Sequence, residues 1–159
     1  MDITLKTATI MDLKKIQELN FKLFEKEKKE YDPLLDVDWV FEKDGTKYWQ
    51  DKISKEDCCV LVAIVDGKIV GYLCGELAKE GAYRRLPAIV AAYLETTLVL
   101  DEFRSKGIGK KLYDKFLEWC KTKNVNKVML DVAAKNELAI KFYRRNNFRD
   151  YSLVLETDL

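Results

Sequence analysis

The pair Asp66-Gly67 separates two apolar runs, and it constrains the fold of this chain more than any other sequence feature. An Asp-Gly pair favours the tight primed turn of a β-hairpin, because that turn needs positive φ angles. The runs on either side, residues 59–65 and 68–77, are long enough to be strands. The sequence therefore predicts an antiparallel strand pair near the middle of the chain.

Other strand and helix patterns surround this hairpin. Residues 3–8 alternate as a strand does, and apolar residues at helical spacing follow Asp12, a candidate N-cap. A second helical region covers residues 37–53, with an interruption near Gly45. The rest of the chain is predicted as a polar loop (80–87), a strand (88–100), a helix (108–123), a strand (127–132), a helix (137–146) and a last strand (148–156).

The order of these elements defines the fold class. A strand–helix–strand order in the C-terminal half predicts a right-handed parallel crossover, whereas the hairpin predicts antiparallel pairing in the first half. The length of 159 residues suits one domain, and no linker or repeat interrupts it. We therefore expect a single α/β domain over residues 1–159, a central mixed sheet with helices on both faces.

Charge and composition exclude several classes of partner. Lys and Arg total 28 against 27 for Asp and Glu, so no global field draws the chain to nucleic acid or to a membrane surface. No apolar run is long enough to span a bilayer. The four cysteines show no CxxC spacing and are interpreted as reduced core thiols of a cytoplasmic protein. We expect neither a nucleic-acid nor a membrane partner, and no metal.

The chain contains no histidine, so the usual proton carrier near neutral pH is missing. Acid–base chemistry must then fall to carboxylates, tyrosines, lysines, cysteines or water.

A basic, glycine-containing loop stands between the predicted strand 88–100 and the predicted helix 108–123. Its residues are Arg104, Ser105, Lys106, Gly107, Ile108, Gly109 and Lys110. Glycines let the backbone approach a ligand, and the N–H groups at a helix start favour an anion. Together with three cationic side chains, they suit a pyrophosphate. The alternative is a solvated basic turn in which the glycines serve geometry alone.

The pattern Arg-x-x-Gly-x-Gly after a strand, in this order of elements, resembles the GCN5-related N-acetyltransferase (GNAT) superfamily. Residues 136–148 resemble the second signature of that family. The resemblance implies a GNAT-like acyl-CoA N-acyltransferase fold, with acetyl-coenzyme A (acetyl-CoA) as co-substrate on the loop 104–110. The chain departs from the family at Ser105 and Asn147, where glycine is usual. Ser105 still offers its backbone N–H, and asparagine tolerates the left-handed conformation of a helix C-cap.

Tyr143 occupies the position at which, in the family pattern, a tyrosine contacts the cofactor and protonates the departing thiolate. A phenol is a credible proton donor to a thiolate. The alternative is a core aromatic, because Tyr143 shares a helix face with Ala139.

Glu95 lies in an otherwise apolar and hydroxyl-bearing strand, where a carboxylate is costly unless it faces water, a partner or a ligand. Partial burial would suit it to act as a base. Polyamine and small-amine members of the resembled family have a comparable Glu four residues before the Val of the cofactor strand, here Val99. The alternative is a carboxylate paired with a lysine at the sheet edge. Without histidine, Glu95 is the leading base, acting directly or through water.

The resemblance also assigns cofactor contacts outside the loop. It implies that the backbone of Leu98, Val99 and Leu100 binds the pantetheine arm like an added strand. The N–H near Val99 would then be the oxyanion donor. Asn136 would contact the cofactor by its side chain, and a pure helix cap is the alternative.

In the resembled fold, the first two helices and their connection form one wall of the acceptor site. Here this region offers Glu27, Glu30, Tyr31, Asp32, Asp36, Asp38 and Trp39. Carboxylates with aromatics suit a cationic amine, although the neighbouring lysines leave a solvated charged face as the alternative.

The expected function is transfer of acetyl from acetyl-CoA to a primary amine of a small molecule (polyamine, amino acid or similar), by direct attack in a ternary complex. A protein or peptide N-acetyltransferase is one alternative, and a non-catalytic acyl-CoA-binding regulatory module is the other. A homodimer is expected from the resemblance alone.

Overall fold

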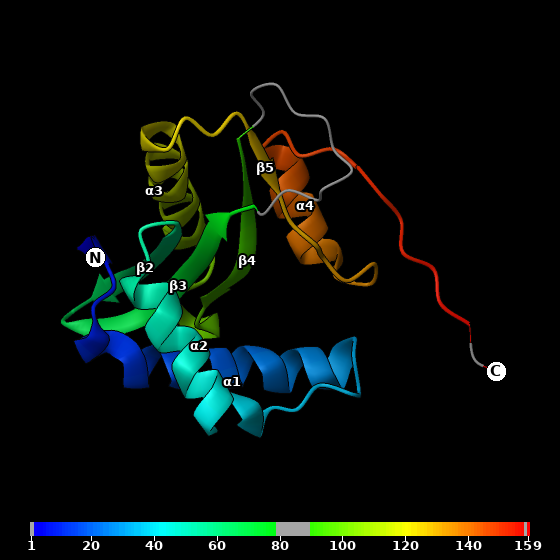
Figure 1. Ribbon diagram of the computed structural model, residues 1–159, viewed down its shortest axis with the longest axis horizontal. Helices are drawn as coiled ribbons and strands as arrows, with labels where there is room; N and C mark the ends of the chain where they lie inside the picture. The colour runs from blue at the N-terminus through cyan, green and yellow to red at the C-terminus, as the bar shows by residue number, and fades with distance from the viewer. Residues whose placement is uncertain (1, 79–89, 158) are drawn as a thin grey trace.

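The computed structural model describes residues 2–78, 90–157 and 159. Within these residues, five strands form one sheet in the order β1-β2-β3-β4-β5. They are β1 (Ile3–Thr7), β2 (Cys58–Val65), β3 (Lys68–Leu77), β4 (Ala91–Val99) and β5 (Lys127–Met129). The pairs are antiparallel up to β4, and β5 joins β4 in parallel. The predicted mixed α/β fold is confirmed (Figure 1).

Helices connect the strands and cover both faces of the sheet. They are α1 (Leu13–Glu30), α2 (Lys43–Ser54), α3 (Ile108–Thr122) and α4 (Glu137–Arg145), with 3-10 turns η1 (Ile10–Asp12), η2 (Asp38–Phe41) and η3 (Asp101–Phe103). Figure 1 shows α1 and α2 on one face, and α3 and α4 pack on the other. The predicted loop 80–87 and the start of the predicted strand 88–100 lie outside the described residues. Among the described helices, none is long and apolar enough to cross a membrane.

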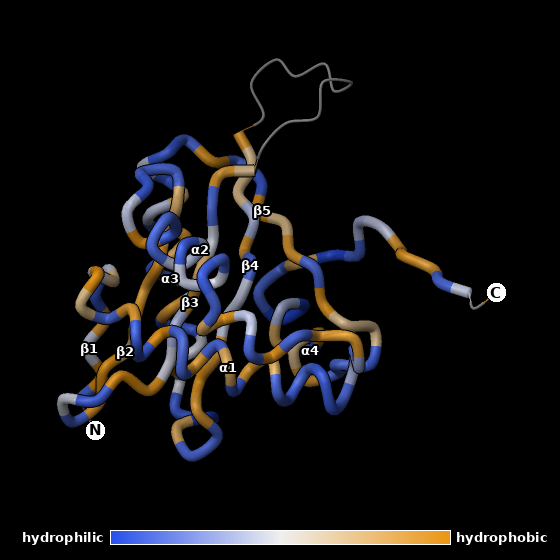
Figure 2. Tube along the Cα trace, turned by 60° about the horizontal axis from the view of Figure 1, so that its bottom comes forward, coloured by the Kyte–Doolittle hydropathy of each residue, from blue (hydrophilic) through white to orange (hydrophobic). Residues whose placement is uncertain are grey.

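Each face of the sheet has its own apolar core. Trp49 of α2 and Tyr72 of β3 are buried on the face that α1 and α2 cover, whereas Phe116 of α3 is buried on the other face. Successive strand residues point to opposite faces, so Val62 belongs to one core and Leu61 to the other. Burial on both faces explains why β2 is apolar at almost every position (Figure 2).

The predicted hairpin is confirmed at its turn. Asp66 and Gly67 have φ angles of 49° and 75°, and Val65 pairs with Lys68. These positive angles are those that a primed two-residue turn requires.

The predicted last strand, residues 148–156, is wrong, because the structure shows no strand there. Tyr151, Leu153 and Val154 are 63%, 77% and 90% exposed, and the segment leads away from the sheet (Figures 1 and 2). The strand predicted through residue 132 ends at Met129. An alternating pattern forms a strand only where a neighbouring backbone supplies hydrogen bonds, and β5 pairs with β4 alone among the described residues.

Two local predictions about helix boundaries are also corrected. The break in the second helical region falls at Glu42, whose extended backbone precedes α2, and Gly45 lies inside that helix. A Cβ at Gly45 would lie 2.0 Å from the Trp39 carbonyl oxygen, so glycine permits the close approach of η2. Asp12 makes no side-chain cap to α1. Its carboxylate instead accepts hydrogen bonds from Lys6 and from the Thr9 N–H.

Candidate active site

Glu95 is the extra residue of a β-bulge in β4. Cys74 of β3 pairs with Thr96 and Gly75 pairs with Leu94, so Glu95 has no counterpart on β3. A bulge re-aims the side chains of the strand that carries it. Leu94 packs in the core under α3, whereas the Glu95 carboxylate reaches residues of α2 on the opposite face.

Three donors converge on one oxygen of Glu95. Tyr48 Oη and Lys52 Nζ each lie 2.8 Å from Oε2, and the Cys74 thiol lies 3.6 Å from the same atom. Burial, followed by the charges of Cys74 and Glu95, raises the pKa of Tyr48 well above its ordinary value. Burial and the Glu95 charge raise the pKa of Cys74. Both groups therefore remain protonated donors, and Oε1 is the carboxylate oxygen without a bonded donor among the described residues.

Lys52 is the buried cation of this cluster. Its side chain is 8% exposed, and its Nζ lies 2.7 Å from Glu76 Oε2 and 2.8 Å from Glu95 Oε2. Burial by itself would lower the pKa of Lys52, but hydrogen bonds to both carboxylates outweigh it and the pKa is raised. One ammonium thus serves two carboxylates, and the cluster is negative overall. The pairing of Glu95 with a lysine, one of the two sequence interpretations, is observed.

A row of aromatic rings adjoins this cluster. The ring centroids of Trp39 and Tyr48 are 5.4 Å apart, and Phe24 of α1 stacks on Trp39 at 6.3 Å. On the other side, Tyr48 contacts the edge of Trp49 at 5.4 Å. Of the acceptor-wall residues expected from sequence, Trp39 is therefore brought next to the Glu95 cluster.

Glu27 is the half-buried carboxylate of the α1 wall. Burial, followed by the charge of Asp32, raises the pKa of Glu27. Its charge contributes to the raised pKa values of Tyr72 and Tyr143, so it lies within electrostatic reach of both phenols. Other wall carboxylates are exposed and match the alternative of a solvated charged face: Glu30, Asp32, Asp36 and Asp38.

Tyr143 projects from α4 into the core under α3 and is 8% exposed. Its ring contacts Phe142 at 5.3 Å and Phe148 at 5.4 Å. Burial, followed by the charge of Tyr113, raises the pKa of Tyr143 to about 12. The core-aromatic interpretation therefore describes its ring, while the phenol keeps its proton at neutral pH, as a proton donor must.

The loop 104–110 leaves backbone N–H groups available at the start of α3. The first loop carbonyl that accepts from this helix is Gly107 O, bonded to Lys111 N at 3.0 Å. The N–H groups of residues 108–110 have no bonded acceptor within the described part of the chain. Gly107 has a φ of 79°, and a Cβ there would meet no atom within 4 Å. An open space before the start of a 15-residue helix suits an anion.

Ser105 adopts the conformation that its glycine counterpart would have. Its φ of 60° lies in the left-handed region, as does that of Asn147 at 67°. The two departures from the family pattern therefore keep the backbone path. Asn147 follows the end of α4, as predicted.

The cationic side chains of the loop are bound to their own neighbours. Arg104 Nε donates to Val99 O at 3.0 Å, and its guanidinium pairs with Asp101 at 2.8 Å. Lys106 Nζ donates to Glu102 O at 2.9 Å, and Lys110 pairs with Asp114. The backbone is thus the more available part of this candidate anion site, since these cations already have partners.

β4 and β5 separate beside this loop. Their pairing covers three positions and ends at Tyr93 with Met129. Leu100 N donates to Val70 O of β3 at 2.9 Å, and backbone direction alternates along a strand. The N–H of Val99 therefore points to the other edge, where β5 has ended. Of the backbone positions expected at Leu98, Val99 and Leu100, this open edge offers the Val99 N–H. The other polar groups of Val99 and Leu100 have partners: Leu100 O accepts from Phe103 N at 2.8 Å, and Val99 O accepts from Arg104 Nε.

Asn136 is the N-cap of α4, because its Oδ1 accepts from Ala139 N at 3.1 Å. The cap interpretation is therefore observed. The described residues contain no cluster of three His, Cys, Asp or Glu side chains able to hold a metal ion.

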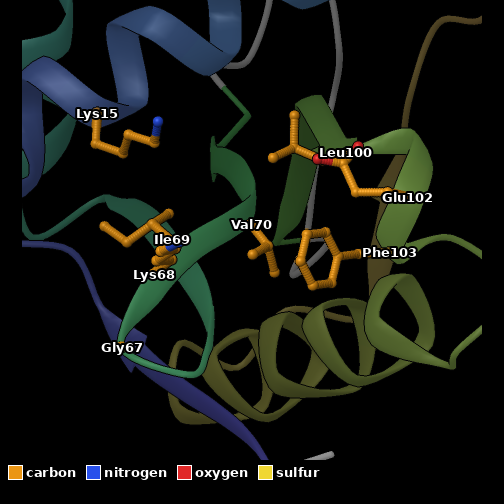
Figure 3. Close-up of a pocket in the computed structure, with 8 residues that line it drawn as sticks. All are labelled: Lys15, Gly67, Lys68, Ile69, Val70, Leu100, Glu102 and Phe103. Atoms are coloured by element: carbon orange, nitrogen blue, oxygen red, sulfur yellow. The ribbon is translucent and has the colours of Figure 1, made fainter.

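A surface hollow of about 550 Å³ lies elsewhere, between the β2–β3 turn, α1 and η3 (Figure 3). Val70, Leu100 and Phe103 line it, and Lys15 reaches toward it from α1. Of the candidate site residues, Leu100 alone contributes to it. The hollow lacks the Glu95 and Tyr143 side chains.

Sequence reasoning missed the partners of Glu95. Lys52 follows Tyr48 by one helical turn and shares the buried side of α2 with Trp49. A lysine on an apolar stripe was the available signal, because a buried charge needs a partner. That Glu76 shares this lysine depends on the strand register.

The fold is that of the acyl-CoA N-acyltransferases. Residues 15–148 match the model of the "Acetyltransferase (GNAT) family". The chain belongs to this family, and it is an acetyl-CoA-dependent N-acetyltransferase.

Two relatives named as N-acetyltransferases agree with this assignment. An uncharacterized N-acetyltransferase of Archaeoglobus fulgidus is 29% identical over 119 residues, 75% of this chain and 79% of that protein. An N-alpha-acetyltransferase of Sulfolobus acidocaldarius is 32% identical over 98 residues, which span 58% of this chain and 57% of that protein's length.

Two solved structures share the fold. The BH1408 protein of Bacillus halodurans has a TM-score of 0.81 at 22% identity and covers 98% of this chain and 99% of its own. AAC(6')-Iy, solved in complex with the bisubstrate analogue CoA-S-monomethyl-acetylneamine, has a TM-score of 0.75 at 15% identity and covers 100% and 99%.

Proposed function

We propose that this enzyme acetylates the primary amine of a small molecule, such as a polyamine or an amino acid, by direct attack in a ternary complex. The observation that carries this proposal is the separation of β4 from β5. It leaves the Val99 edge open between the Glu95 bulge and the start of α3. An extended ligand that ends in a pyrophosphate fits such an edge, because strand-like hydrogen bonds lead directly to an anion site.

We propose that three parts of the chain hold acetyl-CoA. The strand end formed by Leu98, Val99 and Leu100 would bind the pantetheine arm at its open Val99 edge, and the loop 104–110 would bind the pyrophosphate through its N–H groups. Asn136 would add its side-chain amide, while its Oδ1 caps α4. A solved neighbour, AAC(6')-Iy, is bound to a CoA-containing analogue, which supports the same use of this fold here.

Acetyl-CoA supplies an activated thioester carbonyl. In the proposed reaction the acceptor nitrogen bonds to that carbon and the C–S bond breaks. Glu95 takes one proton from the acceptor ammonium, directly or through water, and Tyr143 gives its proton to the leaving thiolate. The second proton of the acceptor nitrogen, which is released as the amide forms, restores the phenol of Tyr143. The Val99 N–H donates to the developing oxyanion. These roles agree with the open Oε1 atom of Glu95 and with the protonated phenol of Tyr143.

The wall beside Glu95 supports a cationic acceptor. Trp39, Tyr48 and Phe24 present aromatic rings, and Glu27 adds a half-buried carboxylate without a cationic partner within ion-pair distance in the described ranges. Aromatic faces and carboxylates both attract ammonium groups. AAC(6')-Iy was solved with an acetylneamine analogue, which supports a small amine.

A protein or peptide N-terminal amine is the second candidate acceptor. The similarity to the N-alpha-acetyltransferase of Sulfolobus acidocaldarius favours it. We also propose a homodimer, an expectation carried over from the family. The four free cysteines support a location in the reducing cytoplasm.

An acceptor screen tests the proposal. Free CoA release is measured with acetyl-CoA and polyamines, amino acids, aminoglycosides, or peptides with free and with blocked N-termini. We expect turnover with a small amine and none with blocked peptides. A preference for peptides with free N-termini would select the second candidate. Absence of both CoA release and a thermal shift with acetyl-CoA would remove the proposal.

A further inference from the structure

We propose that Lys52 is a positioning residue of the acceptor site, which holds Oε2 of Glu95 and leaves Oε1 to receive the acceptor's proton. The inference rests on the proposed role of Glu95 as the base. It assigns the function of a buried lysine that lies outside the cofactor loop, and it names the oxygen that does the chemistry.

The bulged position of Glu95 requires another residue to hold its side chain. Because Glu95 is the bulged residue of β4, pairing with β3 does not fix its backbone as it fixes Leu94 and Thr96. Its carboxylate is instead held by contacts from α2 and β3. Lys52 and Tyr48 both donate to Oε2 at 2.8 Å. With Oε2 so occupied, rotation of the carboxylate would cost two charge-assisted hydrogen bonds.

Lys52 also separates two acids. Glu76 and Glu95 lie 2.7 Å and 2.8 Å from the same Nζ atom, so their carboxylates are close neighbours. Without the ammonium, two like charges would face each other in one site with no cation between them, and like charges in one site repel. Lys52 is the cation within ion-pair distance of either carboxylate in the described residues.

The other titratable groups around Glu95 do not replace this charge. Tyr48 of α2 and Cys74 of β3 are neutral donors with raised pKa values. The Cys58 thiol of β2 lies 3.9 Å from Glu76 Oε2, and burial raises the pKa of Cys58 to about 11. Burial, followed by a hydrogen bond to Asp131, raises the pKa of Tyr93 on β4, and the Glu95 charge adds to this. Glu27 of α1 is a further acid on this side of the sheet.

Removing the charge of Lys52 should therefore change the pH dependence of the reaction. In Lys52→Met, the acidic limb of kcat/KM is expected to move to higher pH by about one unit or more. Lys52→Arg keeps the positive charge and can donate to both carboxylates. Its acidic limb should therefore lie at the same pH as that of the wild type. Adding Glu76→Gln to Lys52→Met removes the competing acid and should return the limb toward that of the wild type.

Glu76→Gln alone provides an independent reading if Lys52→Met does not fold. It gives Glu95 sole use of the ammonium, so the acidic limb should move to lower pH. Lys47→Met is the matched control: Lys47 lies on the same helix, is 69% exposed and pairs with Asp51. Its replacement should leave the profile unchanged.

The decisive measurement is kcat/KM from pH 5 to 10 for these variants, with acetyl-CoA affinity and melting temperature measured alongside. Equal acidic limbs in the wild type, Lys52→Met and Glu76→Gln would overturn the inference while the proposed function stands. A wild type that binds acetyl-CoA but acetylates no amine would remove the proposed function, and the inference with it.

Discussion

The phenol of Tyr48 on α2 donates a 2.8 Å hydrogen bond to Oε2 of Glu95 on β4. Tyr48→Phe keeps the ring contacts with Trp39 and Trp49 and removes this donor. A hydrogen bond to a charged group contributes about 1.5–3 kcal/mol, so we expect the free energy of unfolding to fall by about 2 kcal/mol. We also expect lower kcat/KM, because Oε2 is held less firmly.

Urea denaturation and steady-state kinetics measure the two effects of Tyr48→Phe. Tyr151→Phe is the control, since Tyr151 is 63% exposed and contacts Lys127 through its ring. If both variants match the wild type, the Tyr48–Glu95 bond has no role in stability or activity.

Tyr143→Phe should lower kcat by about 100-fold or more, because a positioned general acid contributes about 10²–10⁴-fold. The pKa of Tyr143 is raised to about 12, so the phenol remains protonated up to pH 10. The ratio of wild-type to variant kcat should therefore stay constant between pH 7 and 10. A ratio that declines in this range would mean that the phenol ionises earlier and is not the acid as described.

The raised pKa of Tyr143 also predicts a stability effect in alkali. The neutral phenol is favoured in the folded state, so this contribution is fully present below the unfolded value of about 10. It is lost as the pH rises toward 12. Wild-type stability should therefore fall more steeply between these pH values than that of Tyr143→Phe, as seen in urea midpoints.

Gly107→Ala and Gly67→Ala form a matched pair. Their φ angles are 79° and 75°, and a Cβ at either site meets no atom within 4 Å. Each alanine should cost about 1–2 kcal/mol for the left-handed conformation. Only the added methyl group at Gly107 stands before the start of α3, so only Gly107→Ala should weaken acetyl-CoA binding. Isothermal titration calorimetry measures the acetyl-CoA affinity of both variants. Equal affinities would contradict the proposed pyrophosphate site at Gly107.

Asn147 tests the second departure from the family pattern. With a φ of 67°, Asn147→Gly should be neutral or slightly stabilising, whereas Asn147→Ala should destabilise the protein by about 1 kcal/mol. Melting temperatures of the two variants measure this difference. Equal values would show that the backbone at the end of α4 relaxes out of the left-handed conformation.

Local sequence preferences predicted most of the fold. The Asp66-Gly67 turn, the start of α3 after Gly107 and the Asn136 cap of α4 depend on φ preferences and on hydrogen bonds within a few residues. The prediction of a last strand over residues 148–156 was wrong. Alternating residues have only a preference for extended backbone, and a strand forms from them only beside a neighbouring strand.

The sequence by itself determined the hairpin. It also predicted an anion site at the loop 104–110 and the candidate roles of Glu95 and Tyr143, and these stay predictions. Only the tertiary structure decided how Glu95 is held, because Lys52 and Glu76 lie on different elements and meet it through a bulge in β4. A bulge shifts the facing of side chains by one residue, and single-chain periodicity does not reveal it. Long-range contacts between buried charges depend on that register, which therefore also decides which oxygen of Glu95 has no bonded donor among the described residues.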